Sequence, residues 1–110
     1  MKTPPYFVKM ASGDMAIILD DGVSYESFPA FAKHWADRLR LTIVRQVDGP
    51  AERIWECQRE GCQFWLAFDD WFPEISLEPM NSDSNQLIQV IAAEAGFDET
   101  RMEVVNPFGS

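Results

Sequence analysis

The chain has 110 residues, of which 46% are hydrophobic and 25% charged; these are ordinary values for one globular domain and exclude a wholly disordered chain. Its formal net charge of −9 is expected to repel nucleic acid and anionic membranes and to speed encounter with basic partners. No apolar run is long enough to span a bilayer, and the start MKTPPYFVKM has no apolar segment of signal-peptide length. We therefore predict a cytoplasmic protein that binds neither nucleic acid nor membrane.

The net charge is concentrated in one part of the chain. Residues 1–59 carry eight basic and eight acidic side chains, which cancel, and Arg101 cancels Glu103. Residues 60–100 hold nine acidic side chains and no Lys or Arg. This segment either presents an acidic surface to a basic partner or only keeps the domain soluble, because net charge governs association and solubility rather than fold.

The first half of the chain predicts a hairpin, a helix and a strand. Tyr6 to Ala11 and Met15 to Asp20 have the pattern of short strands joined by turn residues. Leu41 to Val47 is rich in β-branched residues and predicts a strand that ends at the turn residues after it. The helix between them begins at Ser27 as N-cap, and four apolar residues form its buried stripe: Phe28, Ala32, Trp35 and Leu39.

Three further strands are predicted after residue 50. Residues 51–58 and 62–68 alternate in polarity, and Gly61 between them is able to take a positive φ in a hairpin turn. The alternation places one set of side chains toward the core: Trp55, Cys57, Cys62, Phe64, Leu66 and Phe68. Glu74 to Glu78 alternates again and predicts the next strand.

The C-terminal part predicts a second helix and an edge strand. The helix is expected over Ser84 to Ala95, with Asp83 as N-cap and Gly96 ending it. Met102 to Val105 is expected to add an edge strand, and the tail from about residue 106 is expected to be mobile. The whole is a single α+β domain: a largely antiparallel sheet of about five to six strands, in the order ββ-α-βββ(β)-α, with two helices packed on one face.

The stretch FWLAFDDWFPEISLEP, residues 64–79, places two acids and two aromatics in one predicted turn. Pro73 cannot sit in a central ladder, so we expect Asp69 and Asp70 to lie in a turn. A turn of this kind could hold a cation, but hard cations usually need six or more oxygen ligands, which disfavours a metal site. Trp71 and Phe72 either anchor a partner beside Asp69, Asp70 and Glu74, or fold back to close the core.

Trp65 is a second candidate for contact with a partner. Alternation points it away from Phe64 and Leu66, and Ile54 is expected beside it across the hairpin. If helices cover only one face of the sheet, Trp65 and Ile54 form an apolar patch on the open face, which marks an interaction site. The other interpretation is that part of the tail covers them.

The remaining reactive residues do not form a catalytic or metal-binding pattern. Cys57 and Cys62 flank a short loop at a separation that permits a disulfide, although buried, inert thiols are the usual case. His34 is the one histidine, and it is predicted to be a solvated helix residue. Four zinc ligands are not available, and no phosphate-binding or nucleophile motif is present. We therefore predict no cofactor and no metal.

The string GCQFWLAFDDWFPEISLEP, residues 61–79, resembles a family of short bacterial proteins of about this length, classed as a domain of unknown function. The likeness centres on this string and extends loosely over residues 25–95. It implies a small, single-domain, bacterial, cytoplasmic protein. It implies no activity and no catalytic residues.

The leading hypothesis is a non-catalytic, acidic protein-binding module for a basic partner. Its candidate contact residues are Ile54, Trp65, Asp69, Asp70, Trp71 and Glu74. An antitoxin or immunity-like role, in which the domain masks a basic protein, fits the charge. One alternative is a small-ligand or enzymatic site at residues 69–74 that uses Asp69 or Asp70 as acid or base. Another is a homodimer through the open sheet face.

Overall fold

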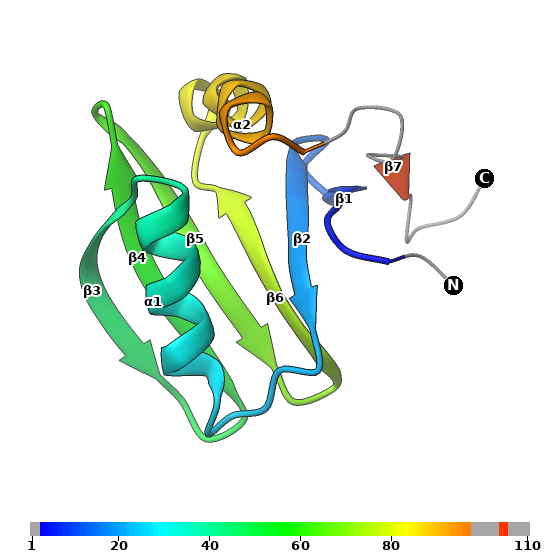
Figure 1. The fold of residues 1–110 in the computed structure, drawn as a ribbon, viewed down its shortest axis with the longest axis vertical. Helices are drawn as coiled ribbons and strands as arrows, with labels where there is room; N and C mark the ends of the chain where they lie inside the picture. Colours follow the sequence, from blue (N-terminus) through cyan, green and yellow to red (C-terminus); the bar gives the residue numbers. More distant parts are fainter. Residues whose placement is uncertain (1–2, 98–103, 106–110) are drawn as a thin grey trace.

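The computed structural model describes residues 3–97, 104 and 105 as two helices and one sheet (Figure 1). Along the chain the elements are β1 (Tyr6–Lys9), β2 (Met15–Asp21), α1 (Phe28–Arg38), β3 (Thr42–Asp48), β4 (Glu52–Arg59), β5 (Cys62–Asp69), β6 (Phe72–Pro79), α2 (Ser82–Glu94) and β7 (Val104–Val105). The strand order is β3-β4-β5-β6-β2-β1-β7. Neighbours pair antiparallel except β1 and β7, which are parallel. The predicted α+β fold is confirmed.

The edge strand predicted near the C-terminus is confirmed in part. Val104 and Val105 pair with Phe7 and Val8 of β1, which adds a seventh strand to the five or six expected. The rest of the predicted Met102 to Val105 segment and the tail from residue 106 lie outside the described residues.

The β4–β5 hairpin has the register that its turn dictates. Glu60 and Gly61 form a two-residue loop with φ of 51° and 77°, and positive φ at both positions matches the right-handed twist of the strands. Cys62 consequently lies opposite Arg59, and Cys57 lies opposite Phe64. The disulfide considered from the sequence does not form, and both thiols are free.

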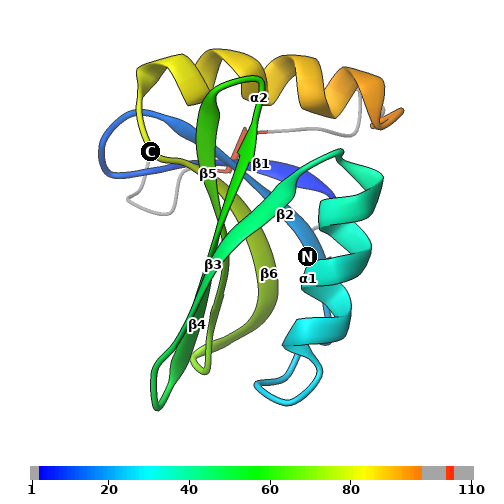
Figure 2. The same cartoon turned by 90° about the vertical axis from the view of Figure 1, so that its left-hand side faces the viewer.

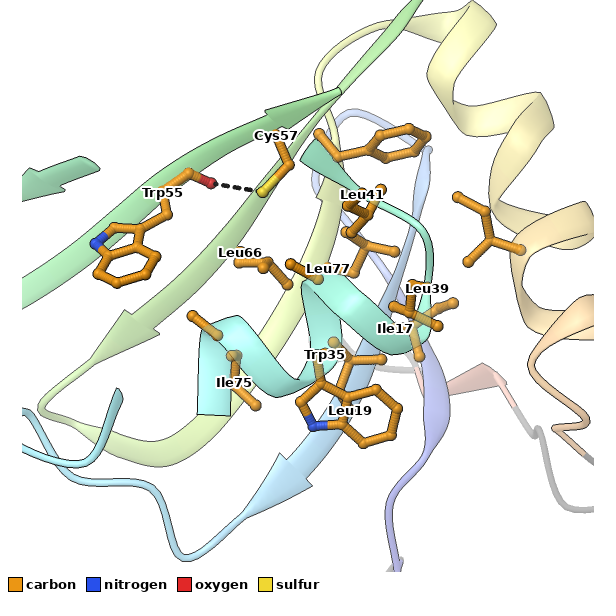
Figure 3. Packing of buried hydrophobic residues seen from close by; sticks show 14 of the residues in the cluster. Ile17, Leu19, Trp35, Leu39, Leu41, Trp55, Cys57, Leu66, Ile75 and Leu77 are labelled. Carbon is orange, nitrogen blue, oxygen red and sulfur yellow. Dashed lines mark hydrogen bonds between the residues drawn. The ribbon is translucent and has the colours of Figure 1, made fainter. Parts of the chain in front are cut away.

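The core fills one face of the sheet, as the alternation predicts. Trp55, Cys57, Phe64, Leu66 and Phe68 all belong to the buried cluster or pack against it, together with the four residues of the α1 stripe. Figure 3 shows this cluster, with side chains from several strands meeting those of α1. Since these strands bury alternate residues, their other side chains must point to the open face.

The two helices cover the core at different places. Figure 2 shows α1 lying along one side of the sheet and α2 running across its end. Asn81 caps α2 by accepting the Ser84 N–H at 2.9 Å, so the predicted Asp83 cap is wrong and the helix begins at Ser82. Gly96 ends this helix with φ of 77°, as predicted. No helix in the described part of the chain is long and apolar enough to cross a membrane.

Strand β6 begins earlier than predicted, at Phe72 rather than Glu74, and therefore includes Pro73. The register between β5 and β6 shifts between Ala67 and Asp69, so Pro73 lies at an irregularity rather than in a regular ladder. Its carbonyl accepts the N–H of Val23 at 3.0 Å. Pro73 thus avoids a regular central ladder, as expected. The prediction that β6 begins only after Pro73 is wrong.

Replacing Arg40 with glycine is expected to raise the free energy of unfolding by about 0.5–1 kcal/mol, because Arg40 follows α1 in the left-handed region with φ of 57°. The Leu41 N–H bonds the Ala36 carbonyl at 2.7 Å, which is the hydrogen bond of a helix end that favours glycine. Urea denaturation checks this. Glycine at Lys33, an exposed position inside the same helix, should instead cost about 1 kcal/mol.

Candidate functional site

The open face of the sheet is defined by side chains that alternate with the core. One row of cross-strand neighbours runs from Ile54 to Ala67 and on to Ser76. The adjacent row runs from Glu56 to Trp65 and on to Glu78. Because directly paired residues share a face, both rows lie opposite the helices. Trp65 and Ile54 therefore occupy neighbouring rows of the open face, as the sequence predicts.

A hollow of about 280 Å³ lies on this face, and we call it the acidic hollow. Ile54, Ala67 and Ser76 form the row across its middle. Alanine and serine are small, so this row stands lower than its neighbours. The side chains around it are aromatic or acidic: Trp65, Phe72, Glu52, Asp69, Glu74 and Glu78. The hollow exists because two small residues are paired between bulky ones.

The electrostatic character of the acidic hollow is uniform. Four of its lining residues are carboxylates, and none is Lys or Arg. Glu78 accepts the Ser76 hydroxyl at 2.8 Å, and Glu74 accepts the Tyr6 hydroxyl at 3.4 Å. Both donors are neutral hydroxyls, so these two hydrogen bonds do not neutralise the carboxylates. The arrangement is suited to receive a cationic group.

Glu74 is a partly buried carboxylate of the acidic hollow, and it lies beside another acid. Partial burial raises the pKa of Glu74 and the negative charge of Asp21 adds to the rise, while the Tyr6 hydroxyl opposes it. Asp21 pairs with Glu74 across β2 and β6, which explains the like-charge contribution. A carboxylate with a raised pKa on an open face gains stability when a cation binds beside it.

Replacing Glu74 with glutamine is expected to stabilise the free domain at pH 7. The pKa of Glu74 is higher in the folded state than in the unfolded state, so the native state loses stability as pH rises through that interval. Glutamine removes this loss and still accepts from Tyr6. The urea midpoint of Glu74→Gln should exceed that of the wild type at pH 7, and the gap should close near pH 4. Asp37→Asn, on the exposed side of α1, removes the same charge and should give a smaller gain.

The aromatic turn does not close the core. Asp70 and Trp71 form the two residues between β5 and β6, and Trp71 is 84% exposed. Phe72 is 63% exposed at the rim of the acidic hollow. The interpretation in which these aromatics fold back into the core is therefore wrong. Trp71 stands at the tip of the hairpin, where a partner could reach it.

The two adjacent aspartates serve different surfaces, and only Asp70 lies in the turn; the prediction that Asp69 also lies there is wrong, because β5 continues to Asp69. Asp69 lines the acidic hollow and accepts the Trp71 N–H at 2.8 Å. Asp70 lines a second hollow with Tyr25 and Glu26, and its N–H bonds the Ala51 carbonyl at 2.9 Å. Both side chains are exposed, so neither is the buried carboxylate that the enzymatic alternative requires.

The possible chemistry of the candidate metal ligands and of the Cys57 thiol depends on how these groups are placed in the described part of the chain. Among residues 3–97, 104 and 105, no group of three or more His, Cys, Asp or Glu side chains could hold a metal ion. The carboxylates of the acidic hollow are thus spread around it rather than converging on one point. Burial raises the pKa of the Cys57 thiol to about 11, which keeps it protonated and unreactive at neutral pH. His34 is exposed on α1, as predicted.

A family model described as "Protein of unknown function (DUF3630)" matches residues 6–95. The chain belongs to the DUF3630 family. The match runs from β1 to the end of α2, so the DUF3630 domain includes every residue that lines the acidic hollow. The resemblance to a domain of unknown function is confirmed, while the bacterial origin that it implied stays a prediction. No curated protein and no solved structure matches this chain.

Four of the six predicted contact residues are brought together in this DUF3630 member, and two are not. Ile54, Trp65, Asp69 and Glu74 line the acidic hollow, whereas Asp70 and Trp71 lie in the turn beyond it. Sequence reasoning missed Glu52, Glu78 and the small pair at the middle of the hollow. The signal was present, because Glu52 lies two residues before Ile54, and Glu78 lies two residues after Ser76; residues two apart on a strand share a face.

Proposed function

We propose that this domain is a non-catalytic, acidic protein-binding module whose open sheet face binds a basic partner. The observation that carries the proposal is the acidic hollow, in which four carboxylates and two aromatic rings surround small side chains with no lining Lys or Arg. Aromatic residues beside complementary charge are typical of protein interfaces, where the rings anchor the partner and the charges select it.

The exposed turn extends this surface. Trp71 projects at the end of the β5–β6 hairpin whose strands carry Asp69 and Glu74. An exposed tryptophan at the rim of an acidic face is an effective anchor, because it buries a large area at low entropic cost. A cytoplasmic location is part of the proposal, and the two free thiols agree with a reducing compartment. Masking of a basic toxin is one role that would use such a surface.

A homodimer through the same face is less favourable on electrostatic grounds. A second copy would bring its own Glu52, Asp69, Glu74 and Glu78 against the identical set, and like charges across an interface are repulsive. Each chain also carries a net charge of −9. Size-exclusion chromatography at low salt separates the alternatives, since a dimer held by this face should dissociate when Trp65 is replaced by alanine.

The proposal is tested by a pull-down from native lysate at low and high salt, comparing wild type with the triple variant Asp69→Ala/Asp70→Ala/Trp71→Ala. A matched control, Asp37→Ala/Glu60→Ala/Val90→Ala, removes two exposed acids and one exposed apolar side chain elsewhere. We expect a stoichiometric basic protein with wild type and control, weakened by salt and lost with the triple variant. Equal capture by all three proteins, or a partner with an acidic surface, would count against the proposal.

A further inference from the structure

We infer that the acidic hollow receives the guanidinium group of an arginine side chain from the partner. This inference rests on the proposed function and specifies which feature of a basic protein the open face recognises.

The size of the acidic hollow suits one long side chain. Trp65 and Asp69 mark two of its lining positions on β5, four residues apart, which corresponds to about 13 Å along a strand. Its volume of about 280 Å³ is below the range of most small-molecule pockets, about 300–1,000 Å³. An arginine extends several bonds from its backbone, so it can enter the hollow while its own chain stays outside.

The lining chemistry favours guanidinium over ammonium. Guanidinium is planar and weakly hydrated, stacks on aromatic rings and pairs with carboxylates through two parallel hydrogen bonds. The hollow offers the rings of Trp65 and Phe72 and carboxylates near both of them. Ile54 and Ala67 supply an apolar surface for the aliphatic stem. A lysine would gain the charge attraction but neither the stacking nor the paired hydrogen bonds.

The chain already uses this combination for its own Arg53. The guanidinium of Arg53 lies 4.6 Å from the centre of the Tyr25 ring, and its Nε donates to Asp48 at 2.7 Å. Arg53 projects from β4 toward the core side, next to Ile54, which faces the acidic hollow. One face of β4 therefore carries an aromatic–carboxylate site filled by an internal arginine, and the other carries a similar set of groups without an internal cation among its lining residues.

The test is an NMR titration of the ¹⁵N-labelled full chain with three capped pentapeptides, Gly-Ser-Xaa-Ser-Gly, in which Xaa is arginine, lysine or citrulline. Citrulline keeps the shape of arginine and removes its charge. We expect the arginine peptide to shift the Trp65 indole and Ala67 amide resonances with a millimolar dissociation constant, as befits one side chain. The lysine peptide should bind at least threefold more weakly, and the citrulline peptide should produce no saturable shift.

Two variants localise the binding without removing charge. Ala67→Leu fills the middle of the hollow, and Phe72→Leu removes the exposed ring at its rim. Each should weaken arginine binding, Ala67→Leu by at least tenfold, and the dispersion of the amide spectrum shows whether each remains folded. Asp37→Asn, which removes charge on α1, should leave binding within twofold of wild type.

The outcomes separate this inference from the proposed function. The arginine assignment is overturned if the lysine and arginine peptides bind equally, or if Ala67→Leu and Phe72→Leu both leave arginine binding unchanged. In either case a salt-sensitive partner in the pull-down still supports a module that binds a basic protein. Shifts spread evenly over all acidic surfaces also overturn the arginine assignment. Saturable, hollow-specific arginine binding together with a pull-down that captures nothing basic supports the site and overturns the protein partner.

Discussion

Replacing Phe28 with alanine is expected to lower the free energy of unfolding by about 3–5 kcal/mol, a large fraction of the roughly 5–15 kcal/mol that stabilises a typical domain. Phe28 is fully buried at the start of α1. Its ring meets Trp55 edge-on with 5.3 Å between ring centres and lies 6.1 Å from Phe68. Removing the ring leaves a cavity between the helix and strands β4 and β5, because close-packed surroundings relax only in part.

The loss at Phe28 should also disturb the open face of the sheet, because the core and the open face are formed by the same strands. Trp55 and Phe68 alternate with Ile54 and Ala67, which line the acidic hollow. Urea denaturation followed by tryptophan fluorescence measures the change. Phe72→Ala removes the same ring from a side chain that is 63% exposed, and its cost should stay below about 1 kcal/mol. Equal losses for the two variants would contradict the assignment of Phe28 to the core.

The fold was predictable wherever the pattern of polarity was unambiguous. The four apolar residues of the first helix are all buried, and the alternating residues of the β4–β5 hairpin divide between the two faces as expected. Local chemistry was less decisive at helix ends. Asn81 and Asp83 are both good capping residues, and only the backbone decides, since Asn81 has the extended conformation that a cap requires.

The acidic hollow was less predictable because it depends on pairing between strands. Alternation assigns Ala67 and Ser76 to the open face, but their juxtaposition depends on the β5–β6 register, which shifts immediately after Ala67. Asp69 lines the hollow because β5 continues one residue further than predicted and so keeps Asp69 on the face of Ala67, while Asp70 lies in the turn. The polarity pattern alone fixes neither the register nor the end of the strand. Counting charge along the chain also failed to identify Glu52, because it belongs to residues 1–59, which carry no net charge.

Reversing two charges of the acidic hollow, Glu52→Lys/Glu78→Lys, is expected to weaken binding of a basic ligand by about 100-fold or more. Glu52 lies on β4 and Glu78 on β6, so the reversals place cations on two different strands that line the hollow. Like charges brought together across an interface cost several kcal/mol, and each lysine also repels the incoming guanidinium directly. The readout is fluorescence anisotropy of a fluorescein-labelled peptide of alternating arginine and serine.

A matched variant distinguishes local geometry from net charge. Asp37→Lys/Glu60→Lys makes the same two changes of charge at exposed positions on α1 and in the β4–β5 turn, so each double variant moves the net charge from −9 to −5. If the protein attracts basic ligands only through its overall field, the two variants should lose affinity equally, and salt should erase the loss in both. If the acidic hollow contacts the ligand, the control variant should lose only a few-fold in affinity. The difference in affinity between the two variants should then persist at physiological salt, because charges in contact with the ligand are screened less than distant ones. Equal loss would therefore reduce the acidic segment to a role in solubility and long-range attraction, whereas a persistent gap would assign recognition to the strands that carry Glu52 and Glu78.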